Sequence, residues 1–81
     1  MYYLLFTSDH CPSCPQMKKA VQSLNLGHFE FNVDKPEGSK IAKEFNVRSL
    51  PTFIVSNSME PNGELNRLTG SWPIEKIKET L

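Results

Sequence analysis

Residues 9–17 read DHCPSCPQM and contain both cysteines of the chain, Cys11 and Cys14. A disulfide between them would close a very short loop, and the chain-entropy model gives such a loop about 2 kcal/mol of stabilisation or less. A structural role for the pair is therefore weakly supported. In a reducing compartment a CxxC pair is typical of redox catalysis or of metal binding, and both roles stay open on these residues alone.

The two cysteines stand between a predicted strand and a predicted helix. Residues 2–7 are an apolar run, which is typical of a strand buried on both faces. Downstream, apolar residues recur at helical spacing along one face: Met17, Ala20, Val21 and Leu24. Cys11 then lies at the helix N-terminus, where free N–H groups and the helix dipole lower the pKa of a thiol. We therefore expect Cys11 to be a nucleophile, and Cys14, one turn further on, to attack a mixed disulfide formed on Cys11.

Two prolines shape the start of this helix. Pro12 fits the first helical position, where the missing N–H of proline costs nothing. Pro15 disfavours a helical conformation for Cys14, because the residue before a proline is sterically restricted. The first turn of the helix is therefore predicted to be irregular.

The remaining pattern predicts three further strands. Residues 28–33 alternate apolar and polar side chains, which indicates a second strand. Residues 52–56 and 64–69 are two more strands, and the segment 57–63 between them is rich in turn-forming residues. We expect this last pair to be an antiparallel hairpin with an enlarged loop.

Two further helices complete the prediction. One opens at residues 34–37, ends near Asn46 and has an apolar face of Ile41, Ala42 and Phe45. The other begins at a Ser71 cap and carries Ile74, Ile77 and Leu81 on one face. The element order is β-α-β-α-β-β-α, whose β-α-β start requires a right-handed crossover between parallel strands. The prediction is an α/β fold, one domain over residues 1–81, with a four-stranded mixed sheet and helices on both faces.

Charge and hydropathy exclude several classes of function. Nine acidic and nine basic side chains balance, and nucleic-acid binding would need a basic surface. No apolar stretch reaches the length of a membrane span, and residues 1–7 lack the basic region and cleavage site of a signal peptide. We therefore expect a cytoplasmic protein with neither a nucleic-acid nor a membrane partner.

Four motifs follow one another along nearly the whole chain: CPSC (11–14) after the first strand, NVDKPEGSKIAKEFNVRSLPTFIV (32–55), NGE (62–64) and GSW (70–72). In this order they resemble the thioredoxin/glutaredoxin family. The combination of CPSC with a downstream LPT at this distance is specific, whereas either motif alone is not. The proline of LPT stands at the entrance of a predicted strand, one of the few places where a strand accepts proline. The resemblance implies the thioredoxin fold in its minimal form, without the extra N-terminal strand and helix of full thioredoxins.

The resemblance also implies roles for particular residues. Cys11 would be the attacking thiol and Cys14 the resolving thiol of a thiol–disulfide oxidoreductase that reduces protein disulfides. Pro51 would be a cis proline beside the cysteines, and the backbone of Leu50 would pair with an extended substrate. Gly70 would let the backbone of a partner approach. The substrate-contacting set is predicted to be Pro12, Ser13, Leu50, Pro51 and Gly70.

The chain departs from the thioredoxin pattern at two positions. Thioredoxins usually carry a buried acid in the first strand that manages the proton of the second cysteine, and Leu5 stands in its place. A lysine common in their next strand is replaced by Glu30, which either substitutes for the missing acid or is simply solvated. Asp9 and His10 flank the nucleophile and either tune it electrostatically or lie on the loop surface.

The choice between thioredoxin and glutaredoxin rests on three segments. A proline directly after the first cysteine is glutaredoxin-like, whereas VRSLPTF (47–53) and NGE are thioredoxin-like. The Gly-Gly-acid segment that holds glutathione is replaced by TGSWP (69–73), in which Trp72 is a packing or partner-contact residue. We therefore expect a monomer that receives electrons from a thioredoxin-reductase-type flavoenzyme, with glutathione as the alternative source.

A metal-binding module is the competing class of function. Four thiolates from two chains could share a zinc ion or an iron–sulfur cluster. One chain has only two cysteines and two histidines, so it cannot supply such a site alone. The prediction is a protein without a bound metal or cofactor, whose redox group is the Cys11–Cys14 disulfide.

Overall fold

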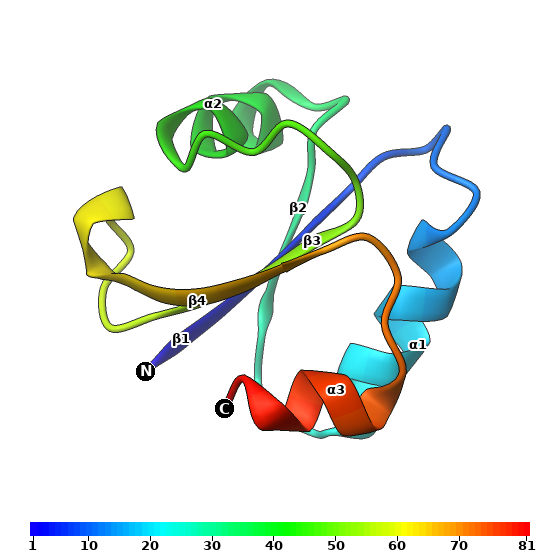
Figure 1. The fold of residues 1–81 in the computed structure, drawn as a ribbon. Coiled ribbons are helices and arrows are strands. Elements are labelled where there is room, and N and C mark those ends of the chain that lie inside the picture. Colours follow the sequence, from blue (N-terminus) through cyan, green and yellow to red (C-terminus); the bar gives the residue numbers. More distant parts are fainter.

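The first apolar run forms a central strand of a four-stranded sheet. A computed structural model describes all 81 residues, and its strands lie in the order β2-β1-β3-β4 (Figure 1). The strands are β1 (Tyr2–Thr7), β2 (Phe29–Asn32), β3 (Thr52–Ser56) and β4 (Glu64–Thr69). β1 pairs with β2 in parallel, and the other two pairings are antiparallel. The predicted mixed sheet and its closing hairpin are confirmed.

The helices cover both faces of this sheet. Helix α2 (Pro36–Glu44) lies on one face, and helices α1 (Cys14–Ser23) and α3 (Ile74–Glu79) lie on the other (Figure 1). A short 3-10 turn, Pro61–Gly63, is inserted in the hairpin loop. The predicted element order is confirmed. Helix α1 connects the parallel strands β1 and β2, and helix α2 connects β2 to β3.

The core is split by the sheet into two clusters, which explains the continuous apolar character of β1. Leu4 and Phe6 point toward α2, and the cluster there is completed by Ala42, Phe45 and Ile54. Leu5 points the other way, into a cluster with Met17, Val21, Phe53, Val55, Leu68 and Ile77. Successive side chains of a strand alternate between faces, so a strand covered by helices on both faces must be apolar at every position.

The start of α1 differs from the prediction. The helix begins at Cys14, so Cys11 lies three residues before it and Pro12 lies in the preceding turn. Pro15 occupies the first helical turn, where a backbone N–H has no intrahelical acceptor, and the missing N–H therefore costs no hydrogen bond. The irregularity falls before the helix, where the Cys14 N–H donates to the Cys11 carbonyl at 3.3 Å.

The last helix is shorter than the sequence predicts. Pro73 is its N-cap residue, with an extended backbone, and the Ser71 hydroxyl instead donates to Gln16 Oε1 at 3.5 Å. The predicted Ser71 cap is therefore wrong. Because α3 ends at Glu79, the side chain of Leu81 does not reach the core and is 48% exposed. Two other elements are also shorter than predicted. β2 covers residues 29–32 instead of 28–33, and α2 ends at Glu44, two residues before Asn46.

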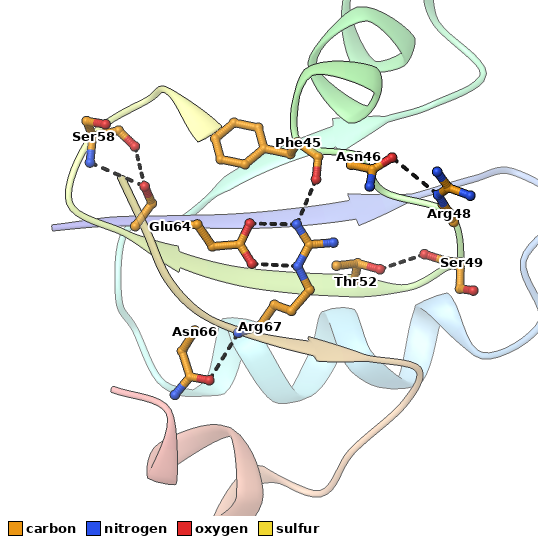
Figure 2. A network of polar contacts seen from close by, with 10 residues as sticks. Phe45, Asn46, Arg48, Ser49, Thr52, Ser58, Glu64, Asn66 and Arg67 are labelled. Atoms are coloured by element: carbon orange, nitrogen blue, oxygen red, sulfur yellow. Dashed lines mark hydrogen bonds and ion pairs between the residues drawn. The ribbon is translucent and has the colours of Figure 1, made fainter. Parts of the chain in front are cut away.

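The partly buried Arg67 anchors the start of the segment that leads into β3. Figure 2 shows the Arg67 guanidinium of β4 donating through Nε and Nη2 to both carboxylate oxygens of Glu64, each at 2.6 Å. Nη2 also donates to the carbonyl oxygen of Phe45, just after α2, at 2.7 Å. The hydrogen bonds to Glu64 raise the pKa of Arg67 above its ordinary value. The hydrogen bond to the Phe45 carbonyl thus anchors the backbone directly before residues 46–50, which lead to Pro51.

Candidate functional site

The cysteines lie at the edge of the sheet where the parallel strands end. Thr7 of β1 is paired in register with Asn32 of β2, and the Val33 N–H donates to the Thr7 carbonyl at 2.8 Å. β3 runs antiparallel to β1 and begins at the same edge, because Thr52 pairs with Phe6. The loop after β1, the loop after β2 and the segment before β3 therefore meet at one edge of the molecule.

Cys11 and Cys14 are joined by a disulfide whose Cα atoms are 5.4 Å apart. Cys14 is only 4% exposed, whereas Cys11 is partly exposed. Ser13 precedes the helix as its N-cap residue, and its hydroxyl lies 3.9 Å from Cys11 Sγ. Because a disulfide sulfur carries no proton, the hydroxyl is the donor of that contact. The sulfur that an incoming thiolate can reach is that of Cys11.

A network of polar contacts holds the loop that carries Cys11. The Asp34 carboxylate accepts the Ser8 hydroxyl and the Asp9 N–H, both at 2.8 Å on Oδ2. These two bonds keep the pKa of Asp34 below its ordinary value. The Asn32 amide donates to Asp9 Oδ1 at 2.9 Å, and the Cys11 N–H reaches the Ser8 carbonyl at 3.4 Å. The segment directly before Cys11 is thus hydrogen-bonded to residues at the end of β2.

Pro51 is buried and its bond to Leu50 is cis, as the sequence predicts. The Pro51 carbonyl accepts the Gly70 N–H at 2.7 Å, which joins the start of β3 to the segment after β4. No hydrogen bond within the chain uses the N–H or the carbonyl of Leu50. Gly70 has a φ of +92°, and the space that a Cβ would occupy there is open. An unpaired backbone donor and acceptor beside an open glycine form a surface to which an extended peptide can bind.

A polar cavity of about 300 Å³ lies beside the disulfide, on the side of β2. Both cysteines line it, together with Glu30 of β2 and Lys18 of α1. Glu30 is paired with Leu5 in the parallel register, and its carboxylate makes an ion pair with Lys18 Nζ at 3.0 Å. Leu5 itself is fully buried in the core. An acid on the neighbouring strand therefore faces the cavity that Cys14 borders.

The structure brings most of the predicted site residues to one edge of the sheet. Asp9, Cys11, Pro12 and Ser13 belong to the loop after β1, and Cys14 begins α1 directly after it. His10 is exposed on the same loop with no side-chain hydrogen bond. The sequence reasoning missed residues that hold or line the site: Ser8, Lys18, Asn32 and Asp34. Ser8, Asn32 and Asp34 lie at or just after the carboxyl ends of the parallel strands β1 and β2, and polar residues at such ends are a recognisable signal of a site.

No three His, Cys, Asp or Glu side chains gather closely enough to hold a metal ion. No helix is long and apolar enough to cross a membrane. The chemistry that the site displays is that of its cysteine pair. Thiolates exchange with disulfides through a mixed disulfide, and a partly exposed cysteine next to an enclosed one can perform both steps. The fold and the site define a thiol–disulfide oxidoreductase of the thioredoxin fold.

Comparison with known proteins identifies the family. The family model of the thioredoxin-like domain matches residues 2–81. A probable thioredoxin of Archaeoglobus fulgidus is 33% identical over 83 residues, covering 91% of this chain and 86% of that protein. A thioredoxin of Thermus thermophilus has a solution structure with a TM-score of 0.71 and 32% identity, covering 98% of this chain and 69% of that one. The thioredoxin of Malassezia sympodialis is similar in fold, with a TM-score of 0.78 and 19% identity, over 98% of this chain and 70% of that one.

The chain belongs to the thioredoxin family. The resemblance inferred from the four sequence motifs is confirmed, and so are the thioredoxin fold and thiol–disulfide oxidoreductase activity.

Proposed function

We propose that the protein reduces disulfides of other proteins, with Cys11 as the attacking thiol and Cys14 as the resolving thiol. The observation that carries this assignment is the difference in exposure between a partly exposed Cys11 and a Cys14 that is 4% exposed. The Cys11 thiolate attacks one sulfur of the target disulfide, whose other sulfur leaves as a thiolate and takes a proton. Cys14, deprotonated, attacks Cys11 in the mixed disulfide and releases the second target thiol. Two electrons pass to the target, and the Cys11–Cys14 disulfide forms.

The target segment binds along Leu50. Its backbone N–H and carbonyl are free to pair with an extended strand, and Gly70 leaves room for the partner's main chain. Pro12, Ser13 and Pro51 complete the contact surface next to the reactive sulfur. All of these groups come from one chain, so the protein is proposed to act as a monomer without a metal or other cofactor. The working compartment is the cytoplasm, where thiols are kept reduced.

Glu30 is proposed to handle the proton of Cys14. The cavity between them is polar and, at about 300 Å³, has room for several water molecules. The Glu30 carboxylate is held by Lys18 and faces this cavity, so a proton can leave Cys14 through water when the mixed disulfide is resolved. General base catalysis of this kind contributes about 100-fold or more where it operates.

Glu30→Gln is therefore expected to slow resolution of the mixed disulfide at least about tenfold and to change its pH dependence. Lys18→Gln keeps the carboxylate and removes its ion pair with Lys18, so it separates a loss of base from a loss of that pair. The longer contact of Glu30 with His28 Nε2, at 3.8 Å, is left in place by this variant. Glu60→Gln is the matched control, because Glu60 is exposed and its carboxylate makes no ion pair. Single-turnover rates measured against pH test the role; equal rates and pH profiles for Glu30→Gln and Glu60→Gln would show that Glu30 is only solvated.

A thioredoxin-reductase-type flavoenzyme is proposed as the electron source. The support is the Leu50–Pro51 segment with its free backbone edge and the absence of a Gly-Gly-acid motif for glutathione in residues 69–73. Thioredoxin has a potential of about −270 mV and glutaredoxins about −200 to −230 mV, so the two systems differ by roughly 2 to 3 kcal/mol for two electrons.

A coupled assay of NADPH oxidation tests the electron source. It is run once with thioredoxin reductase and once with glutathione plus glutathione reductase, at matched supply of reducing equivalents and with one protein disulfide as substrate. We expect faster turnover with thioredoxin reductase. Faster turnover with glutathione would assign the chain to the glutaredoxin mode, and no turnover with either would reject disulfide reduction.

A further inference from the structure

A second cleft lies beside Leu50, on the other face of the sheet from the cavity at Cys14. It has a volume of about 300 Å³ and is formed between α2 and residues 46–50. Val33, Val47 and Leu50 are apolar lining residues of the cleft, and Lys43 and Arg48 line it with cationic side chains. We call this the basic cleft. No acidic residue lines it, although the chain as a whole carries equal numbers of acidic and basic side chains.

The two cations of the basic cleft have no acidic partner in the structure. The four ion pairs of the chain involve other residues, and both Lys43 and Arg48 are exposed. Arg48 Nε donates to Asn46 Oδ1 at 3.2 Å, as Figure 2 shows, which directs the side chain and leaves its terminal nitrogens free. The backbone just before Asn46 is anchored, because Arg67 donates a hydrogen bond to the Phe45 carbonyl.

The position of the basic cleft links it to the bound target. Leu50 lines the cleft, and the same residue offers the unpaired backbone groups along which a target segment is proposed to bind. Neighbouring residues of an extended segment are about 3.3 Å apart along the chain. A residue within two positions of the one that pairs with Leu50 therefore lies about 7 Å or less away from it along the segment.

We propose that the basic cleft selects targets that carry an aspartate or glutamate within two residues of the reactive cysteine. The aliphatic part of that side chain would lie on Val47 and Leu50, and its carboxylate would accept hydrogen bonds from Arg48 and Lys43. Charge complementarity favours an acidic residue, because a carboxylate is the group that two unpaired cations lack. This inference rests on the proposed function and names the class of target for the same site.

Two disulfide-linked peptides that differ only in Glu or Gln beside the reactive cysteine test the proposal. For the wild-type protein at low salt we expect kcat/KM about fivefold to tenfold higher for the Glu peptide, with a difference that shrinks as salt is added. In the double variant Lys43→Gln/Arg48→Gln the ratio of the two kcat/KM values should fall to about one. The control variant Lys19→Gln/Lys78→Gln changes the net charge equally but lies on the α1 and α3 side, so the ratio should stay high.

Three outcomes separate the possibilities. Equal kcat/KM for the two peptides with the wild-type protein would overturn the selectivity while leaving disulfide reduction intact. A control variant that loses the ratio as fully as the cleft variant would overturn the cleft as its source, because net charge alone would then explain it. The wild-type rate on a protein disulfide is measured in parallel, and its absence would overturn the proposed function and this inference together.

Discussion

Cys11→Ser is expected to abolish disulfide reduction, and Cys14→Ser to accumulate a stable mixed disulfide with the target. A serine hydroxyl cannot replace the thiolate in either step, so each variant stops the reaction at the step its cysteine performs. The asymmetry follows from exposure. Cys11 is partly exposed at the same edge of the sheet as the free backbone of Leu50, whereas Cys14 is 4% exposed. Both variants should therefore lose turnover, and only Cys14→Ser should form the mixed-disulfide adduct.

Mass spectrometry of each reduced variant mixed with a protein disulfide measures the adduct directly. Both variants should fold, because the Cys11–Cys14 disulfide closes too short a loop to contribute more than about 2 kcal/mol. Thermal unfolding of the reduced wild-type protein provides the matched reference for that contribution. An adduct on Cys11→Ser instead of Cys14→Ser would exchange the two roles, and no adduct on Cys14→Ser would contradict Cys11 as the attacking thiol.

Three of the four strands could be predicted from the sequence with accurate bounds, whereas the ends of β2 and of the helices could not. β1, β3 and β4 fall on the predicted residues. β1 and β3 are apolar runs that end at polar residues, and β4 is bounded by the turn-forming Gly63 and by Gly70. The start of α1 depends on competition between the turn at Pro12 and the first helical turn at Pro15, and both are acceptable to proline. Pro73 likewise delays the start of α3 beyond Ser71. Such local choices are decided by packing and by backbone geometry, which a pattern of residue types does not contain.

The cysteine pair and Pro51 could be located from the sequence, but their surroundings could not. The cavity next to Cys14 depends on the register that sets Glu30 opposite Leu5 and on the reach of Lys18 from α1. The basic cleft depends on how residues 46–50 lie against α2. Distances between side chains of separate elements decide both, so only the three-dimensional structure reveals them.

Gly38 is a further position whose importance only the structure explains. In sequence it is a glycine inside a predicted helix, where alanine is ordinarily more stable by about 0.5–1 kcal/mol. In the structure a Cβ at Gly38 would overlap the main-chain carbonyl group of Asn32, at the end of β2. Helix α2 thus approaches β2 as closely as it does because residue 38 has no side chain.

Gly38→Ala is therefore expected to destabilise the protein by about 2 kcal/mol or more, the opposite sign from its effect on helix propensity. The overlap is with backbone, which a rotamer change cannot relieve, so α2 must move away from β2. Lys40→Ala is the control in the same helix, since Lys40 is exposed and unpaired, and it should stay within about 0.5 kcal/mol of wild type. Urea unfolding of the three proteins measures the difference.

The same movement should reach the active site. Asn32 connects α2 to the loop of Cys11, because its amide donates to Asp9 and its side-chain oxygen accepts the Asp34 N–H at 2.8 Å. Displacing Asn32 loosens the bonds that order residues 8–11, so the folded variant should also react more slowly at Cys11. Alkylation of Cys11 in reduced Gly38→Ala, measured at urea concentrations where the protein remains folded, checks this step. A variant as stable as wild type, or more stable, would mean that the approach of α2 to β2 relaxes without cost.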